Sequence, residues 1–385
     1  MILPDYDNSI LSTMASVLKA YNIPSIYPSI PVLDDMLSPR PKNIIILLLD
    51  GLGKTTIEGI LPEDSFLRRH WQHTVTSVFP STTTAATTAY YTGKSPNEHG
   101  WLGWSLYFKE CAQQLDIFQG LNSYNKQRYS PISPAYKYME FESVFTKIRR
   151  LTDDQVHTAS VFPFPSECDK GANARLVSGS HSFTHMLDMV EKQAGADKGE
   201  QFILAYWTNP DSEAHGSGPL SPQSRTLVMQ MDKEVEAFCK RMEGTDSAVI
   251  VTADHGLRGN MQPIFLNRIP EIMECLIMPP SIEARAMTFF VKPHKKAQFE
   301  KEFSERFGKS FVLYTRQQAL DMQLFGRGET HPKVDDFLGD YIACATGDEY
   351  FLYFVLNQPE EAPFAGAHAG LTEEEMLVPV IALRS

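Results

Sequence analysis

The sequence predicts an α/β protein with a doubly wound, mostly parallel sheet and an α+β cap inserted into it. Short, continuous apolar runs recur along the chain, and most of them stop at Pro, Asp, Asn or Gly. Amphipathic helical patterns lie between several of these runs. Together the two patterns are typical of parallel strands that are buried on both faces and covered by helices. A late change to shorter, closely spaced segments indicates the cap.

The buried strands of the core are expected at the apolar runs themselves, in the order Asn43–Leu49, Thr74–Phe79, His157–Phe162, Gln201–Trp207, Ala248–Thr252 and, near the C-terminus, Met376–Ala382. A helix is expected at Ser182–Lys192, where apolar residues recur at helical spacing on one face. A second, longer helix is expected at Ser221–Met242. It begins Ser-Pro, so Ser221 is its predicted N-cap.

The stretch from Arg258 to Glu361 predicts the cap, because its apolar segments are short and one amphipathic helix separates them. The expected elements are Ala284–Val291, the helix Lys296–Phe307, Ser310–Tyr314, Asp340–Ala345 and Tyr350–Val355, with the strands antiparallel. We therefore divide the chain into a catalytic core at 1–257 and 362–385 and a cap at 258–361. A smaller insertion is expected at Tyr107–Met139, which is polar and rich in tyrosine.

Composition narrows the range of possible functions. The 385-residue chain carries a formal net charge of −12, which disfavours a protein that coats nucleic acid. It has no apolar run long enough to cross a membrane and no start typical of a signal peptide. The five cysteines are widely spaced, as in proteins with reduced thiols. We expect a cytoplasmic protein with no membrane partner; the oligomeric state is left open.

Residues that can bind metal follow the predicted strands. Sites in open α/β sheets gather beyond the carboxyl ends of the strands, so these residues should converge. They are Asp50, Thr83, Asp211, His215, Asp254, His255 and, before the last strand, His368. Carboxylates and imidazoles that converge from several strand ends indicate a binuclear metal site.

The motifs around these residues resemble the alkaline phosphatase superfamily, and within it the type I phosphodiesterase/nucleotide pyrophosphatase branch. That branch has an Asp-Gly strand end, F-P-x-x-T, T-G-x-x-P-x-x-H-G, P-D-x-x-x-H, D-H-G and a late H-x-G. The matching blocks here occur in the same order, at Asp50-Gly51, 79–83, 92–100, 210–215, 254–256 and 368–370. The resemblance spans most of the chain and implies an alkaline phosphatase-like core.

The resemblance also implies roles for single residues. Asp211, His215 and His368 would hold one metal ion, and Asp50, Asp254 and His255 the other. Thr83 would be the nucleophile and a further ligand, and it would form a phospho-threonine intermediate that water hydrolyses. Thr82 and Thr84 stay open as alternatives to Thr83. The two divalent ions are expected to be Zn²⁺, with Mn²⁺ or Fe as alternatives.

The sequence departs from this branch at one substrate position. Nucleotide-cleaving members carry an asparagine five residues after the histidine of His-Gly, whereas counting from His99 gives Trp104 here. Trp104 is therefore the candidate substrate contact, and the substrate class stays open.

We expect a metal-dependent hydrolase of a small phosphorylated substrate, acting on a phosphodiester or a phosphoanhydride. The alternatives are a phosphomonoesterase, a phosphonate hydrolase or a phospho-sugar mutase of the same superfamily. A metal-bound protein without catalytic turnover is the alternative from a different class.

Overall fold

The computed structural model describes residues 1–179, 181–196, 198–353 and 363–385. Its core is a seven-stranded sheet with the order β2-β18-β9-β1-β8-β6-β7. The strands are β1 (Asn43–Leu49), β2 (Trp71–Thr76), β6 (His157–Phe162), β7 (Ala174–Val177), β8 (Gln201–Trp207), β9 (Ser247–Thr252) and β18 (Leu377–Arg384). Strands β9, β1, β8, β6 and β7 are parallel, whereas β18 and β2 run antiparallel to their neighbours. The predicted mostly parallel sheet is confirmed.

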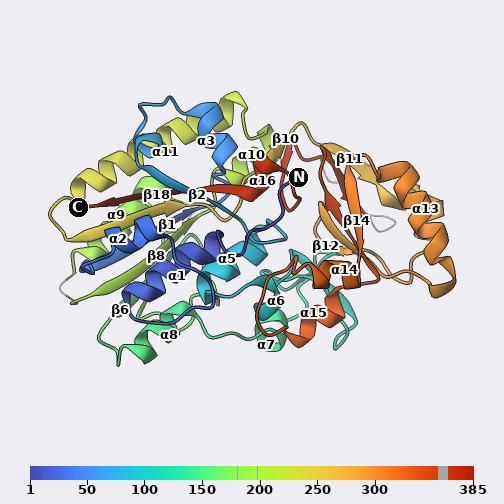
Figure 1. Cartoon of the computed structure of the whole chain (residues 1–385), viewed down its shortest axis with the longest axis horizontal. Helices are drawn as coiled ribbons and strands as arrows, with labels where there is room; N and C mark the ends of the chain where they lie inside the picture. The colour runs from blue at the N-terminus through green and yellow to red at the C-terminus, as the bar shows by residue number, and fades with distance from the viewer. Residues whose placement is uncertain (180, 197, 354–362) are drawn as a thin grey trace.

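Helices cover both faces of this sheet, as the doubly wound prediction requires (Figure 1). One face carries α3 (Lys54–Ile60), α9 (Phe183–Ala194) and α11 (Pro222–Arg241). The other carries α1 (Ile10–Ala20), α2 (Pro31–Met36), α5 (Thr83–Thr92) and α8 (Val144–Leu151). The N-cap predicted for α11 is confirmed, because the Ser221 side chain accepts a hydrogen bond from the Ser224 N–H.

Most of the strand boundaries agree with the sequence analysis, and β1, β6 and β8 coincide with it. Two strands differ: β7 was not predicted, and β2 was expected at Thr74–Phe79 but is found at Trp71–Thr76. The shift of β2 has a physical reason. Its neighbour in the sheet, β18, begins at Leu377 opposite Thr76, so the ladder between these two strands ends there. The buried residues 77–79 instead form the start of the loop that leads to α5.

A second seven-stranded sheet has the order β14-β15-β13-β12-β3-β4-β5. Its strands are β3 (Ser105–Phe108), β4 (Gln113–Asp116), β5 (Leu121–Asn122), β12 (Ser281–Ile282), β13 (Ala286–Phe289), β14 (Phe311–Thr315) and β15 (Tyr341–Ala345). Because β3 pairs with β12, the two expected insertions share one antiparallel sheet. Helix α13 (Lys296–Phe307) packs on it through Phe299, Phe303 and Phe307.

Two further strand pairs of the described chain lie outside the two large sheets. Strand β10 (Arg258–Gly259) pairs antiparallel with β17 (Gly366–Ala367). Strand β11 (Gln262–Phe265) pairs with β16 (Glu349–Leu352), and this pairing is parallel, unlike the antiparallel arrangement expected for the whole cap. The end of the expected strand Tyr350–Val355 and the predicted boundary at 361/362 lie outside the described residues. The division into core and cap stays a prediction.

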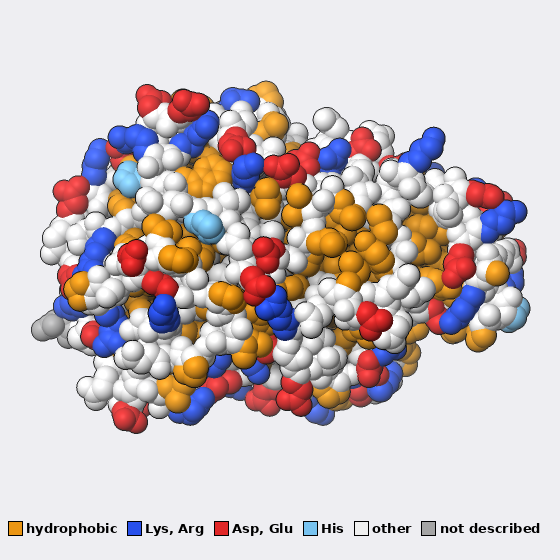
Figure 2. All heavy atoms as spheres, viewed as in Figure 1, with side chains coloured by type: hydrophobic (Ala, Val, Ile, Leu, Met, Phe, Trp, Pro, Cys, Tyr) orange, Lys and Arg blue, Asp and Glu red, His pale blue; other side chains and the backbone are white. Residues whose placement is uncertain are grey.

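The remaining helices are short: α4 (Phe66–Arg69), α6 (Pro96–His99), α7 (Ala135–Tyr138), α10 (Asp211–Ser217), α12 (Pro270–Met273), α14 (Arg316–Asp321), α15 (Pro332–Phe337) and α16 (Glu373–Met376), with 3₁₀ turns at Leu266–Arg268 and Pro293–Lys295. Within the described ranges, no helix is both long and apolar enough to cross a membrane. Acidic and basic side chains are interspersed over the face shown in Figure 2, with hydrophobic side chains gathered over the second sheet.

Candidate metal centre and active site

One group of potential metal ligands lies at the carboxyl ends of two neighbouring parallel strands. Asp50 follows β1, and Asp254 and His255 follow β9; Leu48 and Thr252 are paired in the register of these strands. The ligand atoms of Asp50, Asp254 and His255 lie within 4.8 Å of one another. His255 Nε2 is 3.4 Å from a carboxylate oxygen of each aspartate. The parallel pairing therefore brings together residues that are about 200 positions apart in the sequence.

The turn after Asp50 requires glycine. Gly51 has a φ of +73°, and a Cβ there would lie 2.5 Å from Leu257 Cδ1 and 2.9 Å from Asp211 Cβ. Its N–H donates a hydrogen bond of 3.1 Å to Asp254 Oδ1. The turn thus brings the Asp50 strand end close to both other aspartates, which a side chain at residue 51 would prevent.

A second group of potential ligands comes from α10 and from the loop after β17. Asp211 and His215 are four residues apart on α10, so they share a face of the helix, and their side chains are 3.3 Å apart. His368 follows β17, and its Nε2 lies 3.6 Å from Asp211 Oδ1. The ligand atoms of these three residues also lie within 4.8 Å of one another. The rings of His255 and His368 stack at 3.9 Å between centroids, so the two groups adjoin.

Backbone carbonyls orient all three histidines. Each Nδ1 lies within hydrogen-bond distance of a carbonyl oxygen, at 2.9, 3.0 and 3.1 Å, in the pairs His215–Gly366, His255–Gly256 and His368–Ser81. A carbonyl can only accept, so Nδ1 carries the proton and Nε2 keeps its lone pair free. A second hydrogen bond of this kind is typical of histidines that ligate metal.

The donor set fits two divalent cations. Asp50 Oδ1, Asp211 Oδ1 and Asp254 Oδ2 are buried and have no hydrogen-bond partner in the described structure. A buried carboxylate oxygen without a partner is costly, and a bound cation would compensate for it. Three carboxylates and three imidazoles divided between two groups are donors suited to Zn²⁺, Mn²⁺ or Fe.

The electrostatics of the two groups differ. Burial raises the pKa of Asp50 well above its usual range, and the charges of Asp254 and Asp211 raise it further. Burial also raises the pKa of Asp254. For Asp211 burial acts in the same direction, but His215, His368 and His255 together outweigh it, and the pKa falls below its usual value. Without cations, the Asp50–Asp254 group therefore resists holding two negative charges.

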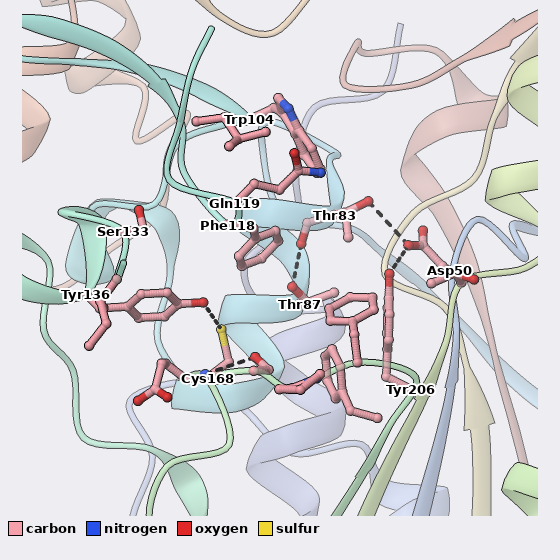
Figure 3. A pocket seen from close by; sticks show the side chains of 18 of the residues that line it. Asp50, Thr83, Thr87, Trp104, Phe118, Gln119, Ser133, Tyr136, Cys168 and Tyr206 are labelled. Atoms are coloured by element: carbon pink, nitrogen blue, oxygen red, sulfur yellow. Dashed lines mark hydrogen bonds between the residues drawn. The ribbon is translucent and has the colours of Figure 1, made fainter. Parts of the chain in front are cut away.

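Thr83 is the first residue of α5, beside the Asp50 group. Its Oγ1 lies 3.4 Å from Asp50 Oδ2 (Figure 3). The same oxygen lies 3.3 Å from His255 Nε2. The alternatives are placed differently: the Thr82 hydroxyl donates to Glu283, and the Thr84 hydroxyl is buried with no partner in the described structure. Of the three threonines, Thr83 is the one whose hydroxyl contacts potential ligands. The first turn of α5 also offers backbone N–H groups to an anion.

Several residues around the site were not predicted from the sequence. The Tyr206 hydroxyl, on β8, donates to Asp50 Oδ2 (Figure 3). Glu283, between β12 and β13, accepts hydrogen bonds from the Thr82 hydroxyl and the Trp104 N–H. Burial raises the pKa of Glu283 to about 7. Tyr206 lies one residue before the end of a predicted strand, and this position could have identified it as a site residue. Glu283 belongs to no motif that could have identified it.

A buried ion pair supports the His368 loop. Arg285 donates to both carboxylate oxygens of Glu375 at 2.6 and 2.8 Å, and both side chains are fully buried. Glu375 in turn accepts from the Gly370 N–H at 2.8 Å. Between His368 and Gly370, Ala369 has a φ of +91°, a strained value for a residue with a Cβ. The ion pair thus helps to hold a strained loop that carries a potential ligand.

Two cavities meet at Thr83, Trp104 and Asp211. The first, of about 580 Å³, extends between the aromatic rings of Phe118, Tyr136, Phe162 and Phe164, and polar residues complete its lining. Figure 3 shows Phe118 and Tyr136 at its wall. The second, of about 520 Å³, extends along the second sheet past Glu283 and Tyr124. Trp104, the predicted substrate contact, stands between them and packs edge-on against Phe118 at 6.2 Å between centroids. A phosphorus centre beside Thr83 would have room for one substituent in each cavity.

Comparisons with known proteins identify the family and similar folds. Residues 44–369 match the family model described as type I phosphodiesterase/nucleotide pyrophosphatase. Among curated proteins, none matches the sequence. Solved structures with a similar fold include murine ectonucleotide pyrophosphatase/phosphodiesterase 5, captured as an inactive variant in complex with AMP. It is 16% identical, with a TM-score of 0.66 over 88% of this chain and 87% of that one.

The fold is also similar to that of phosphonoacetate hydrolase from Sinorhizobium meliloti in complex with phosphonoformate. That enzyme is 16% identical, with a TM-score of 0.63 over 89% of this chain and 90% of that one.

Proposed function

Because the chain belongs to the type I phosphodiesterase/nucleotide pyrophosphatase family, we propose that it hydrolyses phosphodiester or phosphoanhydride bonds, with Thr83 as the nucleophile and two divalent cations as cofactors. The observation that carries the proposal is the position of the Thr83 hydroxyl. It lies 3.4 Å from Asp50 and 3.3 Å from His255, at the first turn of α5 and at the junction of two cavities.

The six clustered side chains would hold the cations in two sites. Asp50, Asp254 and His255 would form one, and Asp211, His215 and His368 the other. When bound, such ions stabilise negative charge on phosphate oxygens and favour the deprotonated form of a nearby hydroxyl. Zn²⁺ is the proposed ion, with Mn²⁺ or Fe as alternatives.

The chain's own residues position and activate the nucleophile. Asp50 Oδ2, which Tyr206 orients through its hydroxyl, is the carboxylate nearest to the Thr83 proton. Thr83 Oγ1 attacks phosphorus, a P–O bond forms, and the bond to the leaving oxygen breaks with that oxygen taking the electron pair. The phosphoryl group on Thr83 then lies against the N–H groups of the first turn of α5. Water cleaves the Thr83–phosphorus bond and restores the hydroxyl.

The test is turnover of bis-p-nitrophenyl phosphate with added zinc or manganese. We expect the wild-type protein to release p-nitrophenol and Thr83→Ala to lose roughly a thousandfold or more in kcat/KM. Thr84→Ala is the matched control, because it removes a neighbouring buried hydroxyl that contacts no potential ligand. Equal rates for the wild type and Thr83→Ala across a panel of esters would contradict the proposal.

The same panel separates the alternatives. A phosphomonoesterase would cleave p-nitrophenyl phosphate faster than the diester, and a phosphonate hydrolase would release phosphate from a phosphonate. A phospho-sugar mutase would move phosphate within a sugar phosphate without releasing it. A non-catalytic protein would bind two metal ions and turn over none of these compounds.

A further inference from the structure

Glu283 brings a carboxylate from the second sheet to the nucleophile loop. Its Oε1 accepts a 2.7 Å hydrogen bond from the hydroxyl of Thr82, the residue before the nucleophile. The same oxygen accepts a 2.6 Å hydrogen bond from the backbone N–H of Trp104. These two contacts fix the carboxylate at the wall of the second cavity, which also includes Thr83, Asp211 and His368. Its charge therefore faces the place where a phosphoryl group would bind.

Glu283 changes the charge balance of the site. While Thr83 is protonated, two divalent cations would outweigh the three clustered aspartates by one positive charge. The Glu283 carboxylate cancels that excess, and bound cations favour its ionised form. A cavity balanced in this way binds a second negative charge on phosphate less favourably than a site with a surplus of positive charge.

The lysine and arginine side chains nearby do not restore a surplus of positive charge beside Thr83. Among the described residues that line the two cavities, Lys126 and Arg128 are the two lysine or arginine side chains. Lys126 is 3.0 Å from Asp116 in an ion pair, and Arg128 is exposed and donates to the Gln119 carbonyl at 3.1 Å. The charge of Lys126 is thus matched by Asp116, and the Arg128 guanidinium is held by a backbone carbonyl at an exposed position of the first cavity.

We propose that Glu283 is a specificity-determining residue that selects phosphoryl groups with a single negative charge, as in phosphodiesters and internal phosphoanhydrides, and disfavours dianionic phosphomonoesters. The proposal deepens the proposed function and depends on it. The competing explanation is that Glu283 only anchors Thr82 and Trp104 through its hydrogen bonds.

Glu283→Gln separates these explanations, since the amide oxygen still accepts from both donors while the charge is removed. The assay compares kcat/KM for p-nitrophenyl phosphate and bis-p-nitrophenyl phosphate on the zinc-loaded protein at about pH 8.5, where the monoester is a dianion. We expect the monoester-to-diester ratio to rise about tenfold or more, through a lower KM for the monoester, with the diester changed less than about threefold. Glu305→Gln, at an exposed position of α13 that lines neither cavity, is the charge-matched control and should leave the ratio unchanged.

A binding measurement keeps the test independent of turnover. Calorimetry of the zinc-loaded proteins should show that Glu283→Gln binds inorganic phosphate, a dianion at this pH, about tenfold or more tightly than the wild type. An unchanged ratio and unchanged phosphate affinity, or an equal loss on both esters, would overturn the role of Glu283. Absence of turnover in the wild type would instead contradict the proposed function, and the phosphate affinity would still decide the role of Glu283.

Discussion

Replacing Asp50 with Asn should stabilise the metal-free protein at about pH 8. The ligand oxygens of Asp50 and Asp254 lie within 4.8 Å of each other. At an effective dielectric constant of about 20, two charges at that distance repel by about 3.5 kcal/mol. Keeping Asp50 protonated at about pH 8 would cost more, about 5.5 kcal/mol, because its unfolded pKa is about 3.9. Burial adds to the cost of the ionised form. The metal-free folded protein therefore bears at least about 3.5 kcal/mol whether Asp50 is ionised or protonated, and Asn removes this cost.

The sign of the pH dependence follows from the raised pKa of Asp50. A carboxyl whose pKa is raised by folding favours the folded state at low pH, and this contribution is lost as the pH rises through the raised pKa. Asp50→Asn and the wild type should thus be equally stable near about pH 4. The stability of the variant relative to the wild type should rise by about 3.5 kcal/mol or more as the pH increases above about 4, and the difference should become constant above the raised pKa of Asp50.

Urea unfolding of chelator-treated protein at about pH 4, 6.5 and 8 measures the difference in stability between the variant and the wild type. The same measurement is then repeated with added zinc. Zinc should stabilise the wild type more than the variant, because the variant lacks one proposed ligand. Asp35→Asn, which changes an exposed aspartate on α2, is the matched control and should leave both the pH dependence and the zinc response unchanged. A metal-free Asp50→Asn protein that is less stable than the wild type at the highest pH, with an undiminished response to zinc, would refute the reasoning.

Three further changes test the site and its support. His368→Ala should lower the bound zinc from two ions to one per chain, measured by elemental analysis after gel filtration; retention of both ions would exclude His368 as a ligand. Arg285→Met leaves Glu375 buried without its partner and should cost about 3–5 kcal/mol in urea unfolding. Adding Glu375→Gln should recover part of that loss, and strictly additive losses would argue against coupling of the pair. Gly51→Ala forces a Cβ against Leu257 and should lower the thermal midpoint and zinc affinity together; a variant with wild-type values would show that the turn can relax.

The core and the proposed ligands could be predicted from the sequence because both follow from parallel strands. A run such as Asn43–Leu49 is buried on both faces, so its apolar residues mark it. Its carboxyl end then lies beside the ends of its neighbours, which places Asp50 next to Asp254. The place of a residue just after an apolar run is enough for this inference, because the carboxyl ends of parallel strands meet at one edge of the sheet whatever the structure of the connecting loops.

The residues around the ligands could not be found in the same way. Glu283 reaches the site from a turn between β12 and β13, and Arg285 reaches Glu375 across 90 positions of sequence. Neither belongs to a periodic pattern, and each depends on how the second sheet packs against the core. The pairing of β3 with β12 is of the same kind, because strands of two to four residues carry little periodicity.

Mass spectrometry of acid-quenched protein during turnover of bis-p-nitrophenyl phosphate tests the role of Thr83 most directly. The peptide that contains Thr82, Thr83 and Thr84 should gain a phosphoryl group that still carries one p-nitrophenyl ester, and fragmentation should place it on Thr83. The Thr83→Ala protein should show neither the adduct nor turnover. Steady turnover with no adduct on Thr83, or an adduct on another residue, would contradict the assignment of Thr83 as the nucleophile.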